Sequence, residues 1–436
     1  MNWIQVEMGT FLEERKQRFN PQDKEISGLQ RIEKIDFSGK IYLSDKPSRT
    51  KMILIKNNDL VISGINVSKG AMNVYSGEKD ILATIHYSSY VYDKKKIDIH
   101  FLQYFLKSAE FKLLLKNQIP GGIKTEIKPK HLLPLKVFIP NKIEDQRKIA
   151  IKLNHQTLKI QSLKDSINYQ NQLLSKLKQS ILQEAIQGKL SKKWRDENPN
   201  IETVSELLER VKAEKEQLIF ENKIRREKPL PSINNDQIPF KLPHKWVWCR
   251  LGNVGFAQTG TTPPKNDNSN FGNYIPFIQP GNISENGLSF NCISLSEKGL
   301  LKSRLIQKYS NMMVCIGGSS GKTCFNKVDV ACNQQINTIT AYSNISYKYL
   351  DIVLKSSYFQ KSVWSNIKQG STPVLNKTRW TSIPIPIAPF QEQKVIVSKI
   401  ELLMQKCHQL EKEIKTSEAN AEMLMQSVLQ EAFNNQ

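Results

Sequence analysis

One short stretch of this chain occurs twice, and the repeat limits what the chain can fold into. Residues 177–187 read LKQSILQEAIQ and residues 424–434 read LMQSVLQEAFN, an offset of 247 residues (424 − 177 = 247). The match continues upstream at the same offset, where IEDQRKIAIKL at 143–153 aligns with FQEQKVIVSKI at 390–400. Strings of this length do not recur by chance, so the sequence predicts an internal duplication.

The duplication covers most of the chain. FLQYFLKSAEF at 101–111 matches YLDIVLKSSYF at 349–359, and WIQVEMG at 3–9 aligns with WVWCRLG at 246–252. Each copy is therefore expected to be a globular region, called a head below, followed by a long helix. The expected boundaries are 1–142 for head 1, 143–188 for its long helix, 189–240 for a helical linker, 241–390 for head 2 and 391–436 for the second long helix.

The two long helices carry an apolar heptad repeat. Such a 3.5-residue period over some 40 residues predicts a coiled-coil seam, and an isolated helix would leave its apolar stripe in water. We expect the two helices to pair antiparallel, giving a pseudo-twofold body; the alternative is that each helix packs on its own head. The expected seam residues are Leu153, Ile160, Leu163, Ile167, Leu174, Leu177, Ile181, Ile396, Ile400, Leu403, Leu410, Ile414, Leu424 and Val428.

Both heads are predicted to be α+β. Short β-like runs such as LVISGI at 60–65 and QQINTITAY at 334–342 alternate with glycine, asparagine and serine turns. One helix is expected near the end of each head. In the linker, Thr203 or Ser205 is expected to cap a helix that runs to about Lys228, where Pro229 stops it.

The net charge of +22 is concentrated on the heads. Residues 1–142 hold 24 Lys and Arg against 15 Asp and Glu (+9), and residues 241–390 hold 16 against 5 (+11). The rest of the chain carries only +2 (22 − 9 − 11). Two separate basic bodies favour binding to a polyanion; the alternative is the general solubility of a lysine-rich protein.

Basic and polar loops provide the candidate contacts to DNA. Lys and Arg suit phosphate groups, whereas Asn, Gln and Ser can contact base edges. The loop IGGSSGKT at 316–323 resembles a P-loop, but only three residues separate Gly317 from Gly321, so nucleotide binding is not expected. The candidates are Arg49, Lys69, Lys124, Lys128 and Lys130 in head 1, and Thr261, Lys265, Ser319, Ser320, Lys322, Gln369, Ser371, Thr372, Asn376, Lys377 and Arg379 in head 2.

The sequence contains no pattern typical of catalysis or metal binding. We find no methyltransferase tetrad, no G-x-G-x-x-G and no nuclease carboxylate pair, and the six cysteines form no C-x-x-C. Free thiols, no signal-peptide pattern and no long apolar run favour a cytoplasmic protein. No cofactor or metal is expected in this chain.

The ordered set of motifs resembles the specificity subunit of type I restriction–modification enzymes. The resemblance covers essentially the whole chain. It rests on the doubled Q-[R/K]-x-I helix starts at Gln146 and Gln393, the helix end LLSKLKQSILQEAIQGKLSKKWR through Arg195, LPHKWVWCRLGNV at 242–254 and the QGST loop at 369–372.

The resemblance implies a non-catalytic DNA-recognition subunit. Its heads would be two α/β target-recognition domains in pseudo-twofold tandem repeat, each recognising half of a bipartite DNA site, with the coiled coil fixing the gap at roughly one helical turn. It also implies two methyltransferase subunits as partners and, for cleavage, motor-nuclease subunits. AdoMet, ATP and Mg²⁺ would belong to those partners. Three alternatives remain open: a restriction or modification enzyme complete in one chain, a free-standing bipartite DNA-binding regulator, and a coiled-coil scaffold without restriction partners.

Overall fold

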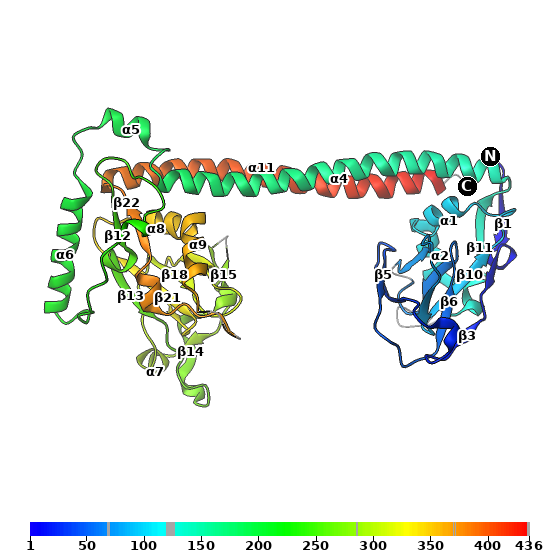
Figure 1. Ribbon diagram of the computed structural model, residues 1–436, viewed down its shortest axis with the longest axis horizontal. Coiled ribbons are helices and arrows are strands. Elements are labelled where there is room, and N and C mark those ends of the chain that lie inside the picture. The colour runs from blue at the N-terminus through cyan, green and yellow to red at the C-terminus, as the bar shows by residue number, and fades with distance from the viewer. Residues whose placement is uncertain (68–69, 119–126, 285–286, 369, 371, 434–436) are drawn as a thin grey trace. The chain divides into compact units, whose positions relative to one another are not determined.

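The computed structural model describes residues 1–67, 70–118, 127–284, 287–368, 370 and 372–433. The chain forms two compact units. Unit 1 comprises Met1–Gln170 with Glu413–Gln436 and contains head 1; unit 2 comprises Asn171–Lys412 and contains the linker and head 2. Each long helix contributes one part to each unit (Figure 1).

Head 1 is built from short strands, with three helices just before the last strand. The strands are β1 (Trp3–Glu7), β2 (Leu12–Glu14), β3 (Arg18–Phe19), β4 (Arg31–Ile35), β5 (Ile41–Ser44), β6 (Met52–Ile55), β7 (Leu60–Ser63), β8 (Met72–Val74), β9 (Ile81–Thr84), β10 (Tyr87–Tyr92) and β11 (Lys136–Pro140). The helices are α1 (Ile99–Phe105), α2 (Ala109–Gln118) and α3 (Pro129–Leu132).

Three sheets organise these strands. β2-β10-β7-β8 form one sheet, β3-β6-β9-β4-β5 form a second, and β1 pairs antiparallel with β11, so that Trp3 lies opposite Pro140. Alternate side chains of a strand point to opposite faces. Leu60 and Ile62 of β7 therefore enter one apolar core while Val61 enters another, which explains the uninterrupted apolar run in this strand.

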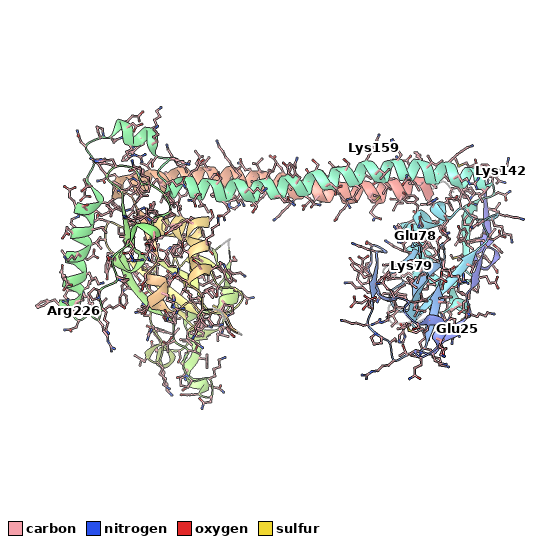
Figure 2. All side chains as sticks on the ribbon, viewed as in Figure 1. Glu25, Glu78, Lys79, Lys142, Lys159 and Arg226 are labelled. Atoms are coloured by element: carbon pink, nitrogen blue, oxygen red, sulfur yellow. The ribbon has the colours of Figure 1, made fainter. Side chains whose placement is uncertain are left out.

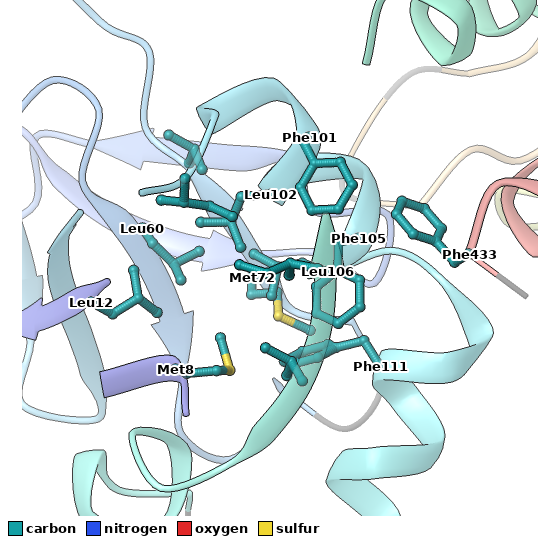
Figure 3. Packing of buried hydrophobic residues seen from close by; sticks show 14 of the residues in the cluster. Met8, Leu12, Leu60, Met72, Phe101, Leu102, Phe105, Leu106, Phe111 and Phe433 are labelled. Carbon is teal, nitrogen blue, oxygen red and sulfur yellow. The ribbon is translucent and has the colours of Figure 1, made fainter. Parts of the chain in front are cut away.

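The end of the second long helix completes the core beside α1. The ring of Phe433 lies 5.6 Å from the rings of both Phe101 and Phe105, centroid to centroid, and Phe105 lies 5.4 Å from Phe111 (Figure 3). The edge-to-face contacts of Phe433 with Phe101 and Phe105 are favourable for aromatic rings. The C-terminal part of this helix is thus a structural part of unit 1.

Head 2 follows the linker in unit 2. Its strands are β12 (Val247–Arg250), β13 (Gly255–Thr259), β14 (Phe271–Ile278), β15 (Ile283–Ser284), β16 (Gly287–Leu288), β17 (Ser294–Leu295), β18 (Ser310–Val314), β19 (Thr323–Phe325), β20 (Ala331–Cys332), β21 (Ile336–Ala341) and β22 (Pro384–Ile387). The linker contains the helices α5 (Lys192–Glu197) and α6 (Val204–Phe220), and head 2 contains α7 (Glu297–Leu301), α8 (Tyr347–Lys355), α9 (Ser357–Asn366) and α10 (Lys377–Thr381).

The sheet order confirms that the heads are duplicates. β13-β21-β18-β19 repeats the order of β2-β10-β7-β8, and β12 pairs antiparallel with β22 as β1 does with β11. The remaining strands differ: head 1 has a five-stranded sheet, whereas head 2 has β17-β14-β20 and the separate pair β15-β16. The α+β class and the tandem arrangement of two sheet-rich domains are confirmed.

The long helices α4 (Ile143–Ile186) and α11 (Phe390–Phe433) pair in opposite directions within each unit. In unit 1, Lys152 Nζ lies 3.1 Å from Glu431 Oε1; in unit 2, Lys178 Nζ lies 2.5 Å from Glu411 Oε1. Early residues of α4 thus meet late residues of α11. Charged side chains such as Lys159 extend from the outer face of α4 into solvent (Figure 2).

Two expectations about helix limits were wrong. The single helix expected near the end of each head is divided in two, into α1 and α2 in head 1 and into α8 and α9 in head 2. In head 2, Ser356 ends α8, and its side chain accepts a hydrogen bond from the Phe359 N–H at the start of α9. The linker helix has Thr203 as its cap, as expected, but ends at Phe220 rather than near Lys228. Asn222 there adopts a left-handed conformation (φ +56°), which terminates a helix.

Candidate DNA-binding surfaces

Four loops of head 2 converge, and we call them the head-2 loop cluster: residues 258–265, 315–322, 332–336 and 372–376. Backbone hydrogen bonds connect them. The Gly317 N–H donates to the Pro373 carbonyl (2.9 Å), the Cys315 N–H to the Gln335 carbonyl (2.7 Å) and the Thr261 N–H to the Cys332 carbonyl (2.9 Å). Candidate residues from three separate stretches of sequence therefore lie on one body.

The loop at 316–323 is not a P-loop. It connects the antiparallel strands β18 and β19, whereas a P-loop joins a strand to a helix whose N-terminus faces the phosphates. Gly317 and Gly321 have φ values of +93° and +94°, which only glycine adopts without strain. A Cβ on Gly321 would also lie 2.5 Å from Gln360 Oε1. Both glycines therefore serve the tight turn.

The candidates in head 2 differ in solvent exposure and in the partners of their side chains. Lys265, Lys322, Thr372 and Arg379 are exposed, and Thr261 and Ser319 are half-buried; Ser320 is buried and its Oγ donates to the Gly317 carbonyl (2.7 Å). Asn376 is exposed, but its side chain caps α10 by accepting from the Arg379 N–H (2.9 Å). Lys377 Nζ lies 2.5 Å from Glu227 Oε1 of the linker. Gln369 and Ser371 lie outside the described residues.

In head 1, Lys69 and Lys124 lie outside the described residues. Arg49, Lys128 and Lys130 are exposed.

A cavity of about 290 Å³ in head 1 is lined by Lys128, which the sequence proposed, and by residues that the sequence reasoning missed. Arg15, Arg18, His86 and Lys128 line it together with Glu14. Arg15 forms an ion pair with Asp59, whose side chain is only 3 % exposed. Arg15 and Asp59 are 44 residues apart in sequence, so only the pairing of β2, β10 and β7 brings them together.

The expected seam is buried mainly at one position per heptad. Leu153, Ile160, Ile167, Leu174, Ile181, Ile396, Ile400, Ile414 and Val428 are buried, and Leu403 is half-buried. Leu163, Leu177, Leu410 and Leu424 are instead 44–47 % exposed. Two paired helices cover only a narrow strip of each other, so the interleaved leucines form an apolar edge in solvent.

The repeated glutamines Gln146 and Gln393 are fully buried and connect each long helix to its head. Gln146 Oε1 accepts from the Asp98 N–H (2.8 Å), while Nε2 donates to the Pro140 carbonyl (2.9 Å). Gln393 Oε1 likewise accepts from the Ser346 N–H (2.8 Å). Asp98 and Ser346 are the N-caps of α1 and α8. The motif that carries the resemblance is therefore structural.

Replacing Gln146 with alanine is expected to lower the free energy of unfolding by about 3 kcal/mol. The substitution leaves buried backbone groups without partners, at roughly 1–3 kcal/mol each. Gln161 on the same helix is exposed and bonds only Asp165 (3.0 Å), so Gln161→Ala is the matched control, with an expected change within about 0.5 kcal/mol. Urea unfolding followed by circular dichroism measures both; equal stabilities would contradict the role assigned to Gln146.

A buried carboxylate joins the linker to head 2. Glu392 is fully buried; its Oε1 accepts from Ser191 Oγ (2.6 Å) and Arg195 Nη1 (2.5 Å), and its Oε2 accepts from Trp246 Nε1 (2.8 Å). All three donors come from the segment between the end of α4 and the start of β12. This network ties that segment to the first turn of α11.

Four cysteines of head 2 are buried. Burial raises the pKa of the thiols of Cys249, Cys315, Cys324 and Cys332 to about 12, so they stay protonated near neutral pH. No group of three or more His, Cys, Asp or Glu side chains there could hold a metal ion. No helix among these residues is both long and apolar enough to cross a membrane.

Comparison with known proteins identifies related chains. Residues 243–417 match the family model of the type I restriction modification DNA specificity domain. The chain is 31 % identical over 281 residues to the Escherichia coli type I restriction enzyme EcoAI specificity subunit, covering 59 % of this chain and 44 % of that one. It therefore spans less than half the length of this relative.

Solved structures share the fold. A chain from a structure of the type I R-M system aligns over 99 % of this chain and 97 % of its own, with a TM-score of 0.66 and 16 % identity. The HsdS subunit from Thermoanaerobacter tengcongensis aligns over the same shares, with a TM-score of 0.52 and 16 % identity.

Proposed function

We propose that the whole chain is the DNA-recognition subunit of a type I restriction–modification complex, because residues 243–417 match the family model of the type I restriction modification DNA specificity domain. It carries out no chemistry itself. Head 1 and head 2 are target-recognition domains that each recognise one half of a bipartite site in double-stranded DNA, in the cytoplasm.

The observation that carries the proposal is one scaffold with two different surfaces. Both heads contain a four-stranded sheet of the same strand order and a two-stranded antiparallel ribbon, yet their remaining sheets and their polar loops differ. A duplicated scaffold with unlike loops suits recognition of two unlike DNA sequences. The charges of +9 on head 1 and +11 on head 2 favour contact with phosphate groups.

The paired helices α4 and α11 are proposed to set the gap between the half-sites. The two helices pair antiparallel within each unit, and buried apolar residues recur every seven positions along both of them. Linking two binding heads raises the effective concentration for the second contact, provided that the linker matches the span.

The exposed leucines of α4 and α11 are proposed to dock the methyltransferase subunits. An apolar edge in water favours burial against a partner. AdoMet would then lie on the methyltransferase subunits, and ATP and Mg²⁺ on motor-nuclease subunits. The leucines are Leu158, Leu163, Leu173, Leu177, Leu402, Leu410 and Leu424.

The test is to co-express this chain with a cognate methyltransferase subunit in a host free of DNA methylation. Single-molecule sequencing then maps modified adenines across the genome. We expect one bipartite motif with a fixed gap, and no such motif when this chain is omitted. A soluble complex that modifies no motif would contradict the proposal and favour a free-standing regulator or a scaffold.

A further inference from the structure

An arginine of head 1 is fixed in place by a buried carboxylate. Arg15 Nε lies 2.7 Å from Asp59 Oδ2, and Nη2 lies 2.8 Å from Oδ1. Asp59 also accepts hydrogen bonds from Ser89 Oγ (2.8 Å) and the Lys56 N–H (2.9 Å). The carboxylate is thus held by several donors, and its two bonds to Arg15 set the plane of the guanidinium.

Arg15 also lines the head-1 cavity, and Asp59 occupies only one edge of its guanidinium. The bonds to Asp59 use Nε and one hydrogen of Nη2, so Nη1 and the second hydrogen of Nη2 remain as a parallel pair of donors. The side chain of Arg15 is 21 % exposed and lines the cavity of about 290 Å³ with Arg18, His86 and Lys128. Hydrogen bonding to Asp59 also raises the pKa of Arg15, so its charge is permanent.

Such a donor pair fits the acceptor pair of a guanine. O6 and N7 of guanine accept two parallel N–H bonds from arginine in the major groove, and this is the commonest base-specific contact. Because Asp59 already fixes the guanidinium, binding does not have to order a flexible side chain, and preorganisation favours affinity.

The pair is specific to head 1, which favours a base over a phosphate as its target. The offset that aligns Trp3 with Trp246 (246 − 3 = 243) places Gln258 at the position of Arg15 (258 − 15 = 243). The same offset pairs Glu14 with Ala257, which lie opposite Tyr90 and Ile339 in their sheets, so Tyr90 and Ile339 are equivalent. On the other side, Tyr90 lies opposite Leu60 and Ile339 lies opposite Asn311. This register places Ser310 at the position of Asp59.

Phosphates are common to every DNA sequence, so a phosphate contact suits both heads equally. A contact present in one head only suits a base that occurs in one half-site only. We propose that Arg15, positioned by Asp59, recognises a guanine in the half-site read by head 1. This inference rests on the proposed function, because it assigns one base to one residue within that function.

The experiment maps the methylated motif for the wild-type chain, Arg15→Lys, Arg15→Ala and Asp59→Asn, each co-expressed with the methyltransferase subunit. Arg15→Lys keeps the positive charge but removes the donor pair. We expect one guanine of the head-1 half-site to become degenerate in every variant, with methylation of the original site reduced roughly 10- to 100-fold. The half-site of head 2 stays unchanged and reports that the complex is intact.

Arg31→Ala is the matched control, because Arg31 is an arginine of head 1 that bonds the Lys46 carbonyl (2.7 Å) outside the cavity lining. It should leave both half-sites unchanged. An unaltered motif in Arg15→Lys, or a uniform loss of methylation in Arg15→Ala with both half-sites intact, would overturn this inference alone. Absence of any bipartite motif with the wild-type chain would overturn the proposed function as well.

Discussion

Replacing Glu392 with alanine is expected to lower the free energy of unfolding of unit 2 by about 3 kcal/mol. Removing one partner of a buried ion pair leaves the other charge uncompensated, which typically costs about 3–5 kcal/mol. Arg195 retains 17 % side-chain exposure, so water offsets part of this cost and the lower end of that range applies. Ser191 Oγ and Trp246 Nε1 lose their acceptor as well.

The repeat supplies a matched control for this prediction. Asp145 occupies the position of Glu392 in the first copy (392 − 145 = 247), but its side chain is 19 % exposed, and its ion-pair partner Lys148, at 3.5 Å, is 70 % exposed. Asp145→Ala should therefore change stability by less than about 1 kcal/mol. Urea unfolding followed by tryptophan fluorescence suits the measurement, since five of the six tryptophans lie in unit 2. Equal effects of the two substitutions would refute the role of the buried network.

Removing one heptad from each long helix, residues 161–167 and 408–414, is expected to shorten the gap in the recognised DNA site by about 3 bp. Seven helical residues span about 10 Å, and one base pair spans about 3.4 Å. The double deletion keeps the heptad register, because Ile160 and Leu174 end up seven positions apart. Methylation of the original site should be lost, because its half-sites no longer match the heads. Methylome sequencing of the co-expressed complex reads out the new gap.

Deletion of residues 161–167 alone is the control, since it leaves an unmatched heptad in α11 and should abolish methylation of any fixed-gap motif. The half-site bases should be identical in the wild-type chain and the double deletion. A double-deletion variant that recognises different bases, or the original gap, would show that the helices do not set the spacing.

The fold was predictable in its repeated parts. An apolar period of seven over some 40 residues identifies a long helix in the sequence alone, and copies at a constant offset identify the equivalent parts of the two heads. The positions Leu153 and Val428 were placed in the seam and are buried. The break at Ser356 was not predicted, because serine is tolerated within helices and becomes a cap only where its side chain meets a free N–H.

The candidate site was less predictable. Loop composition identified exposed residues such as Lys322 and Lys128, but Lys377 is paired with Glu227 and Asn376 caps a helix. These roles depend on neighbours that are distant in sequence. The Arg15–Asp59 pair left no signal in the sequence for the same reason.

The sequence by itself determined the duplication, the long helices, the basic heads and the family resemblance, because each of these is a property of periodicity, spacing or composition along the chain. Only the tertiary structure decided which loops converge in head 2, which leucines of the helices stay in solvent, and that Arg15 and Asp59 meet. Those outcomes depend on strand pairing between distant segments, and the energy of such contacts is not encoded in any local pattern.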